Sequence, residues 1–401
     1  MADNMADAPR EAWITGIGIV SCLGEGREAH WQALQDGRTK TDAQRFAPYI
    51  VHPIAPIDFD KQIPKKGDQR QMEPWQRIGT YAAGLALDDA KIKGNAELLA
   101  KTDMIVAAGG GERDVNADST ILSGLRKSDK PATFLNERLM SDIRPTLFLA
   151  QLSNLLAGNI SIVHGVTGSS RTFMGEEAAG VDAVRIALAR ITSGQSEIAL
   201  VGGAFNAERE DPIMLFEFGG YNLKGEFKPV WERGAPGGFV LGSLGAFLVL
   251  EHRAHAESRG AKPIARLTSA ASDRAKREPG AVKAMLRKLW APLAPRLEAG
   301  RHAIISGATG IEPATSEERA FFGEHADAPV RAVGSLVGHG VEPHFVMCIA
   351  IAALAVSHGK LYPTTDRSGV ERAMEAPLTQ AVVTGVGHWQ GEGMALVEAV
   401  R

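Results

Sequence analysis

The sequence predicts an α/β protein whose two duplicated halves form a five-layer α-β-α-β-α core. Short apolar runs bounded by glycine alternate with helical patterns along the chain, which is typical of α/β folds. In each half, a strand ending in small residues leads into a helix that is apolar on nearly every side, then to glycine and a further strand. Such a helix must be buried between layers, and two of them in matched positions indicate an internal duplication.

The predicted strands fall into two sets. The first set is "AWITGIGIV" (12–20), "DMIVAAGG" (103–110), "SEIALVGGAF" (196–205) and "GAFLVLE" (245–251). The second set is "IARLTSAA" (264–271), "HAIISGAT" (302–309), "VRAVGSL" (330–336), "AVVTGVG" (381–387) and "MALVEAV" (394–400). No low-complexity linker separates the sets. We therefore expect two closely packed halves, at residues 12–255 and 256–401. Residues 1–11 are expected to form a disordered tail before them.

The two buried helices are predicted in "EEAAGVDAVRIALARITSG" and "VEPHFVMCIAIAALAVSHG". The first of them opens in "TFMGEEAAG" (172–180), where Glu176 and Glu177 interrupt a small and otherwise apolar segment. Two carboxylates at this place could be a general acid/base pair, an ordinary helix cap, or the replacement of a nucleophile. The second helix contains "FVMCIAIAALAV" (345–356), which is too short to span a bilayer.

The composition of the chain argues against several function classes. A net charge of −3 over 401 residues gives no reason to expect a nucleic acid or a membrane surface as partner. Cys22 and Cys348 are the only cysteines, so we expect no disulfide framework and a reducing, cytoplasmic setting. Both are interpreted as small core residues rather than reactive thiols. The polar, acidic start of the chain lacks the features of a signal peptide.

Four stretches of the chain carry a resemblance to a known family. They are "ITGIGIVSCLGEGREAHWQALQDGRT" (14–39), "IPKKGDQRQMEPWQRIGTYAAGLALDDA" (63–90), "RPTLFLAQLSNLLAGNISIVHGVTG" (144–168) and "GGFVLGSLGAFLVLEHRAHAESRGAKPIARL" (237–267). Together they resemble the β-ketoacyl-acyl-carrier-protein synthases, the condensing enzymes of the thiolase superfamily. The resemblance runs over nearly the whole chain and implies a thiolase-like fold. Members hold an acyl chain as a thioester on a Cys at the start of the buried helix, where the helix dipole favours the thiolate.

Most of the functional positions that the resemblance implies are replaced in this chain. The positions of the family's Cys, first His, Lys, Glu and aromatic gate fall on Glu177, Ser306, Gly334, Ser243 and His388, in that order. The second His is retained as His339. A carboxyl group is a poor substitute nucleophile, and a lone imidazole cannot supply the two hydrogen-bond donors that malonyl decarboxylation needs. These replacements predict that the chain no longer condenses, and Ser243 and His388 stay as candidate residues of the acyl tunnel and its gate.

The resemblance then favours a structural role over catalysis. We expect a subunit similar to chain-length factors, which pairs with an active synthase in fatty acid, very-long-chain lipid or polyketide synthesis; a homodimer is the other pairing. The alternative is an enzyme with unorthodox residues, either a malonyl-carrier-protein decarboxylase or a 3-oxoacyl synthase that uses Glu177 and His339. For Glu177 itself, three roles stay open: capping the helix, filling the acyl pocket or pairing across a dimer interface, and general acid/base chemistry.

The resemblance also implies an acyl carrier protein as partner. Carrier proteins are acidic, so Lys65, Lys66 and Arg70 are candidate docking residues, and a second basic cluster follows at residues 274–288. A solvated charged face explains the first cluster equally well and is the better explanation for the second. No cofactor and no metal are expected, because His339 and His344, taken to lie five residues apart on one helical stretch, are wrongly spaced to share an ion. Neither membrane insertion nor nucleic acid binding is expected.

Overall fold

The sheet topology repeats itself in the two halves of the chain. The computed structural model describes residues 10–143, 149 and 151–400. The strands of the first half are β1 (Ala12–Ser21), β4 (Thr102–Ala107), β5 (Ser170–Phe173), β6 (Ile198–Phe205) and β8 (Leu244–His252). Those of the second half are β9 (Ala265–Asp273), β10 (His302–Ser306), β11 (Val330–Ala332), β12 (Gln380–Val386) and β13 (Glu392–Glu398). Within each set the strands lie side by side in the order third, second, fourth, fifth, first.

The strand directions repeat as well. In each half the second strand pairs in parallel with the third and the fourth, while the fifth pairs antiparallel with the fourth and the first. The two sheets meet where β1 pairs antiparallel with β9 through Ala12, Trp13 and Ile14. One order and one set of directions in both halves confirm the predicted duplication.

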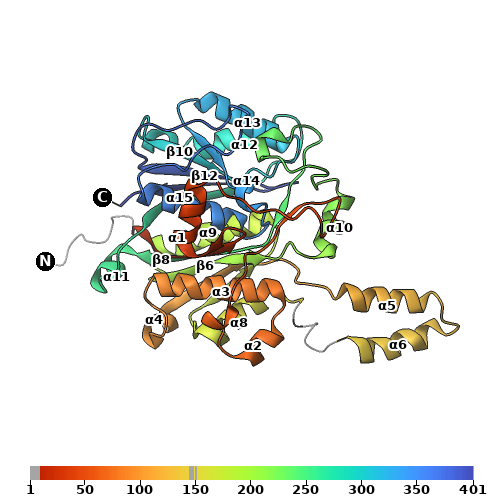
Figure 1. The fold of residues 1–401 in the computed structure, drawn as a ribbon. Helices are drawn as coiled ribbons and strands as arrows, with labels where there is room; N and C mark the ends of the chain where they lie inside the picture. The colour runs from red at the N-terminus through yellow and green to blue at the C-terminus, as the bar shows by residue number, and fades with distance from the viewer. Residues whose placement is uncertain (1–9, 144–148, 150, 401) are drawn as a thin grey trace.

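Helices cover both sheets and fill the space between them (Figure 1). The middle layer holds α9 (Glu177–Thr192) and α15 (His344–Ser357), which pack against each other and against strands of both sheets. The outer layers are α3 (Pro74–Asp89) with α8 (Leu155–His164) on one side, and α12 (Ala281–Trp290) with α13 (Ala314–Phe322) on the other. All residues of α15 except Ser357 are buried, as its continuous apolar sequence predicts. The five-layer arrangement is therefore confirmed.

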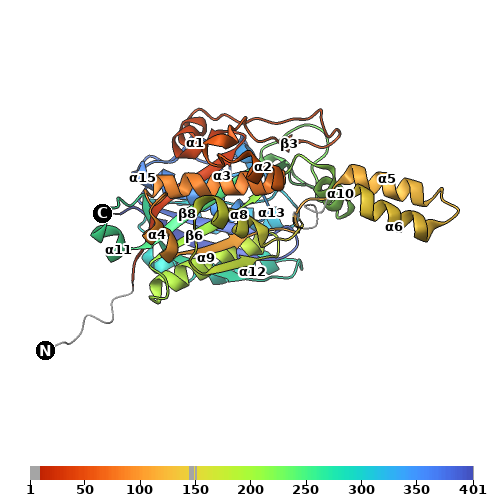
Figure 2. The ribbon, with the colours of Figure 1, turned by 90° about the horizontal axis from the view of Figure 1, so that it is seen from below.

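The remaining short elements lie around this core. They are β2 (Gly24–Glu25), β3 (Val51–His52), β7 (Leu241–Gly242), α1 (Gly26–Gln35), α2 (Lys66–Gln71), α4 (Ala96–Lys101), α10 (Glu210–Phe218), α11 (Arg253–Ser258) and α14 (Gly334–Val337). An arm made of α5 (Val115–Leu125) and α6 (Pro131–Asp142) projects from the body, and both views show it on the same side as α10 (Figures 1 and 2). Within the described part of the chain, no helix is both long and apolar enough to cross a bilayer.

Three sequence-based expectations need correction or limits. The run 330–336 is not one strand, since β11 ends at Ala332 and α14 begins at Gly334; a short apolar run does not distinguish a buried strand from a buried helical turn. The predicted tail overlaps the folded part, because Arg10 forms an ion pair with Glu197 (2.6 Å), while residues 1–9 lie outside the described residues. The proposed boundary at residue 255 falls inside α11, which contacts β1 and β8 of the first half.

The start of α9 is positioned by a close backbone contact at Gly180. A Cβ atom at this residue would lie 2.2 Å from the carbonyl oxygen of Glu342, so only glycine lets α9 approach the segment before α15. We expect Gly180→Ala to lower the free energy of unfolding by about 1–3 kcal/mol through overpacking, as measured by urea denaturation. Gly158→Ala in α8 is the matched control, because its Cβ would enter open space and should stabilise the helix slightly. Equal stability of the two variants would contradict this packing account.

Candidate functional site

Glu177 stands at the N-terminus of α9, where the resemblance places the nucleophile. The chain leaves β5, passes Gly175, and places Glu176 in a conformation with φ 56° and ψ −134° before the helix begins. Such a positive φ is unusual for a residue with a side chain. It turns the backbone sharply, and the Glu177 side chain enters the interior with 6% of its surface exposed. The strand-to-helix turn therefore delivers a carboxylate into the core.

Two imidazoles from distant segments meet this carboxylate. Glu177 Oε1 lies 2.8 Å from His339 Nε2, and both carboxylate oxygens lie 3.0 Å from His388 Nδ1. The backbone N–H of His388 also donates to Oε1, at 3.3 Å. His339 comes from the segment between α14 and α15, and His388 from the loop between β12 and β13. The structure thus brings the retained histidine and the predicted gate residue to the predicted nucleophile position.

The contacts of Glu177 settle its charge. Burial disfavours the ionised carboxyl, but hydrogen bonds from His339 and His388 outweigh burial and hold the pKa of Glu177 well below its ordinary value. Burial likewise opposes the charged imidazole of His388, yet the bond to Glu177 raises the pKa of His388 above its ordinary value. The site therefore favours a buried carboxylate at Glu177 and favours the protonated form of the His388 imidazole. Hydrogen bonds from both imidazoles and from the backbone N–H of His388, most of them to Oε1, stabilise this carboxylate and make it a weaker nucleophile.

Aromatic rings hold both imidazoles in place. Phe239 stacks on His339 with ring centroids 5.1 Å apart. Phe216 and Tyr221 meet the ring of His388 edge-on, at 5.4 and 4.8 Å. These rings come from α10 and from the chain between α10 and β7, so one side of the ion pair is lined by aromatic residues.

Ser306 and Ser243 belong to other hydrogen-bond networks. The Ser306 hydroxyl, at the end of β10, donates to Glu318 Oε1 at 3.0 Å. Ser243 donates to Glu208 Oε2 (3.2 Å) and accepts from the backbone N–H of Ala207. Among the described contacts of these two serines, none involves Glu177. Ser306 thus does not supply the donor that the family's first His would provide, and Ser243 is not brought to the predicted gate.

The neighbourhood of His344 differs from the sequence-based expectation. His344 is the first residue of α15, whereas His339 precedes that helix, so the two do not share a helical stretch. Their rings lie 4.7 Å apart, and burial together with His339 keeps the pKa of His344 well below its ordinary value. Gly334, at the predicted Lys position, begins α14, and a Cβ there would lie 4.0 Å from the His344 ring.

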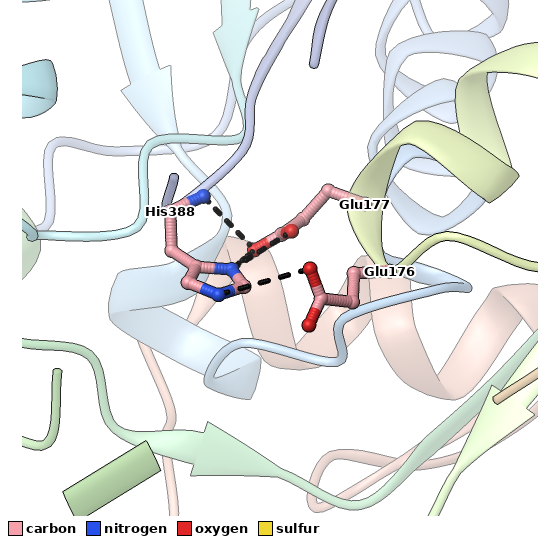
Figure 3. A group of neighbouring side chains, drawn as sticks. All are labelled: Glu176, Glu177 and His388. Atoms are coloured by element: carbon pink, nitrogen blue, oxygen red, sulfur yellow. Dashed lines mark hydrogen bonds and ion pairs between the residues drawn. The ribbon is translucent and has the colours of Figure 1, made fainter. Parts of the chain in front are cut away.

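Two acidic residues near the site were given no role by the sequence. Glu176 accepts a hydrogen bond from Trp389 Nε1, and its Oε2 lies 3.8 Å from His388 Nε2 (Figure 3). Glu342 is 5% exposed, and burial together with the carboxylates of Glu177 and Glu176 raises the pKa of Glu342 to about 7. The only signal for Glu342 was its place three residues after the retained histidine, in "GHGVEPHF".

A cavity of about 200 Å³ lies beside these carboxyl groups. Its apolar wall includes Trp75, Phe205, Leu215, Phe216 and Val341, and its polar wall includes Glu176, Asn206, Arg209, Asp211 and Glu342. Glycines of the segment after β4 close one side, where a Cβ on Gly109 would lie 2.6 Å from Glu342 Oε1. Glu342 therefore narrows the cavity at the point nearest to the glycine segment.

The two basic clusters differ in how much free charge they present. Lys65, Lys66 and Arg70 are exposed at α2, and Lys66 pairs with Asp60 at 2.5 Å. In the second cluster, Lys283 and Arg287 both pair with Glu324. Further pairs there are Lys288 with Asp273, and Arg277 with Glu392. The second cluster is therefore largely neutralised by its own neighbours.

Both cysteines lie buried in the core, and burial raises the pKa of the Cys22 thiol to about 11, as expected for unreactive residues.

Comparison with known proteins identifies the family. The family model described as "Beta-ketoacyl synthase, N-terminal domain" matches residues 10–256, more than half of the chain. The chain therefore belongs to the β-ketoacyl synthase family, and its fold is the thiolase-like fold of that family. This confirms the resemblance read from the sequence.

Individual relatives include both fatty acid and polyketide proteins. The chain is 27% identical over 271 residues to 3-oxoacyl-[acyl-carrier-protein] synthase 2 of Vibrio harveyi, covering 64% of this chain and 61% of the relative. It is 27% identical over 279 residues to the tetracenomycin polyketide synthase ketoacyl synthase beta subunit of Streptomyces glaucescens, covering 64% and 62%. The matched part thus spans less than two thirds of the length of either relative.

Solved structures match over nearly the whole chain. The ishigamide ketosynthase/chain length factor superposes with a TM-score of 0.80 at 20% identity, covering 98% of this chain and 100% of that one. The complex titled "AntDE:AntF (apo): type II PKS acyl-carrier protein in complex with its ketosynthase bound to the hexaketide" gives a TM-score of 0.76 at 18% identity, covering 98% and 100%. At these identities the likeness establishes the fold.

Proposed function

We propose that this chain is a β-ketoacyl synthase homologue that does not condense and that pairs with an active synthase as a chain-length-factor-like subunit. The observation that carries the proposal is the buried carboxylate of Glu177, bound by His339 and His388 at the nucleophile position. A beta subunit and a ketosynthase/chain length factor among the similar proteins support the same role. The setting would be fatty acid, very-long-chain lipid or polyketide synthesis.

The chemistry of the site argues against condensation. A carboxylate that attacks a thioester gives an anhydride, which water hydrolyses readily. An oxyanion needs free donors aimed at the position where its charge develops. Here the described donors, His339 Nε2 and His388 Nδ1, are already engaged by Glu177. An acyl group entering the site would have to displace a buried ion pair, which is costly.

The surface near α10 supports pairing with another chain. Met214, Leu215 and Phe218 of α10 are exposed, with Phe218 at 85%. Leu122, Leu139 and Met140 of the neighbouring arm are exposed as well. Large apolar residues gathered on one side of a protein mark interaction surfaces. We assign this side to the partner synthase, with a second copy of the chain as the other pairing. Lys65, Lys66 and Arg70 stay our candidates for docking an acidic acyl carrier protein.

Co-expression with a cysteine-containing synthase of the same pathway tests this role. We expect a stable 1:1 complex on size-exclusion chromatography. Phe218→Asp should weaken its affinity at least tenfold, because it places a charge in an apolar interface. Lys262→Asp is the control and should leave the affinity unchanged, because Lys262 is exposed and follows α11 in the chain, and Figure 1 shows α11 on the opposite side of the molecule from α10. A chain that stays alone with every candidate synthase would contradict the subunit role.

One observation favours a second candidate function. The structure brings two imidazoles to Glu177, although the sequence predicted only His339 as a donor and His388 as a gate residue. Two imidazole donors are what decarboxylation of a malonyl group requires. The second candidate is therefore a malonyl-carrier-protein decarboxylase in which Glu177 moves aside to release His339 and His388.

A further inference from the structure

Three side chains converge at the start of α9 with their donor atoms turned toward one another. Glu176 and Glu177 come from the helix start and His388 from the facing loop, and the imidazole faces both carboxylates (Figure 3). One donor atom from each residue can be chosen so that all three lie within 4.8 Å of one another. From this arrangement we propose that Glu176, Glu177 and His388 bind one divalent transition-metal ion of the Zn²⁺ class. The proposal goes beyond the subunit role and differs from the expectation of no metal.

The donor set fits such an ion chemically. Zn²⁺ binds imidazole nitrogen and carboxylate oxygen at about 2.0–2.2 Å, so tetrahedral ligand atoms lie about 3.3 Å apart. His388 Nδ1 lies 3.0 Å from both oxygens of Glu177, and His388 Nε2 lies 3.8 Å from Glu176 Oε2. One ion binds only one nitrogen of the ring, so the relevant measure is the set of one donor atom from each residue, and these three atoms lie within 4.8 Å of one another. Small side-chain rotations bring the two carboxylates and one imidazole nitrogen to bonding distance, and the metal replaces the proton of that nitrogen.

Outer hydrogen bonds hold the proposed ligands in place. His339 Nε2 donates to Glu177 Oε1 at 2.8 Å, and Trp389 Nε1 donates to Glu176. Phe216 and Tyr221 fix the ring of His388 from the side. Metal ligands in proteins are commonly oriented by such outer partners, whose loss weakens metal binding. Each of the three proposed ligands thus has a described group that holds its orientation.

An independent observation at Glu342 points to a cation. Glu342 Oε2 is buried without a described hydrogen-bond partner, and Glu342 lines the same cavity as Glu176. The nearest guanidinium on that wall, Arg209, pairs with Asp211 at 3.0 Å and donates to the carbonyl of Gly111. Three carboxyl groups therefore gather here, and the Glu342 carboxyl among them lacks an ion-pair partner in the described part of the chain. A divalent cation offsets them, and this attraction outweighs the opposing positive end of the α9 dipole.

Metal titration of the purified full-length chain tests the proposal. The chain is stripped with EDTA and then titrated with Zn²⁺ by calorimetry and with Co²⁺ by visible absorption. We expect one ion per chain and the intense visible bands of Co²⁺ in a low-symmetry site. His388→Gln and Glu176→Gln should each weaken affinity at least tenfold, with circular dichroism checking that both fold. His358→Gln, an exposed histidine outside the site, should bind as the unaltered chain does.

Two outcomes would overturn the metal site. One is an unaltered chain that binds no stoichiometric Zn²⁺ and gives no Co²⁺ bands; this result needs no variant and so does not depend on variant folding. The other is unchanged affinity in both His388→Gln and Glu176→Gln. Either result would mean that Glu177 and its partners are joined by hydrogen bonds alone, without a metal ion. Since the subunit role is tested by co-purification, failure of the metal site and failure of that role are distinguishable.

Discussion

Replacing Glu177 by alanine is expected to lower the free energy of unfolding by about 3–5 kcal/mol, the range measured when one partner of a buried ion pair is removed. The carboxylate binds His339 Nε2 and His388 Nδ1 at 2.8 and 3.0 Å. Without the carboxylate, two buried imidazoles lose their hydrogen-bond acceptor, and the N-terminus of α9 loses a stabilising negative charge. Urea denaturation at pH 7 with EDTA present measures the change without any contribution from bound metal.

Two further variants make this result interpretable. Glu177→Gln should lose less stability than Glu177→Ala, because its amide oxygen still accepts a hydrogen bond. Glu97→Ala is the matched control, since Glu97 also lies in the first turn of a helix but is exposed, and among the described residues its ion-pair partner is Lys101. It should leave the free energy of unfolding nearly unchanged. If Glu177→Ala were as stable as this control, Glu177 would be no more than a tolerated helix cap.

The second large effect concerns Glu318 and depends on pH. Burial raises the pKa of Glu318 from 4.5 to about 7, although hydroxyl donors from Thr384 and Ser306 oppose the shift. Between these values the unfolded chain ionises the carboxyl group while the folded chain keeps it protonated. The contribution of Glu318 to the free energy of unfolding therefore falls as pH rises from 4.5 to 7, by about 3 kcal/mol for this shift. Above pH 7 the loss is complete.

Glu318→Gln should abolish that loss. Its amide oxygen can accept the bonds from Ser306 and Thr384, which reach Glu318 Oε1 at 3.0 and 2.6 Å, and the other carboxyl oxygen has no described partner to lose. The neighbouring Cys348 thiol stays protonated, because burial and Glu318 raise its pKa. Denaturation from pH 4 to 8 should show the variant gaining on the unaltered chain. Glu97→Gln should show the opposite, small trend, because Lys101 lowers the pKa of Glu97. Parallel curves for Glu318→Gln would contradict the burial account.

Apolar periodicity was sufficient to predict the layered core. The apolar runs at β1, β6, β8 and β12 contain or adjoin glycine, and each run forms a strand near its predicted place. β5 was missed because its residues, "SRTF", are polar and partly exposed at the sheet edge, so they leave no apolar signal. The apolar pattern of a sequence predicts buried strands well, but it does not predict exposed strands at a sheet edge.

The site could be predicted only in part, for a physical reason. Glu177 was found because a motif fixes the number of residues before the helix start. Its bond to His388 joins residues 211 positions apart, and its bond to His339 joins residues 162 apart. No local pattern encodes such contacts. The places of Glu342 and Trp389 in the site could not be predicted either, because both residues come near Glu176 only through folding of distant segments.

The loss of condensation chemistry is tested most directly by incubating the purified chain with acyl and malonyl carrier protein. Intact-mass spectrometry detects any acyl adduct on the chain, and released carbon dioxide is measured in parallel. If Glu177 has replaced the nucleophile without replacing its chemistry, the chain carries no adduct and releases no more carbon dioxide than carrier protein alone. An acyl adduct would contradict the loss of condensation chemistry, and carbon dioxide release above that of carrier protein alone would contradict a purely structural role and establish the chain as an enzyme.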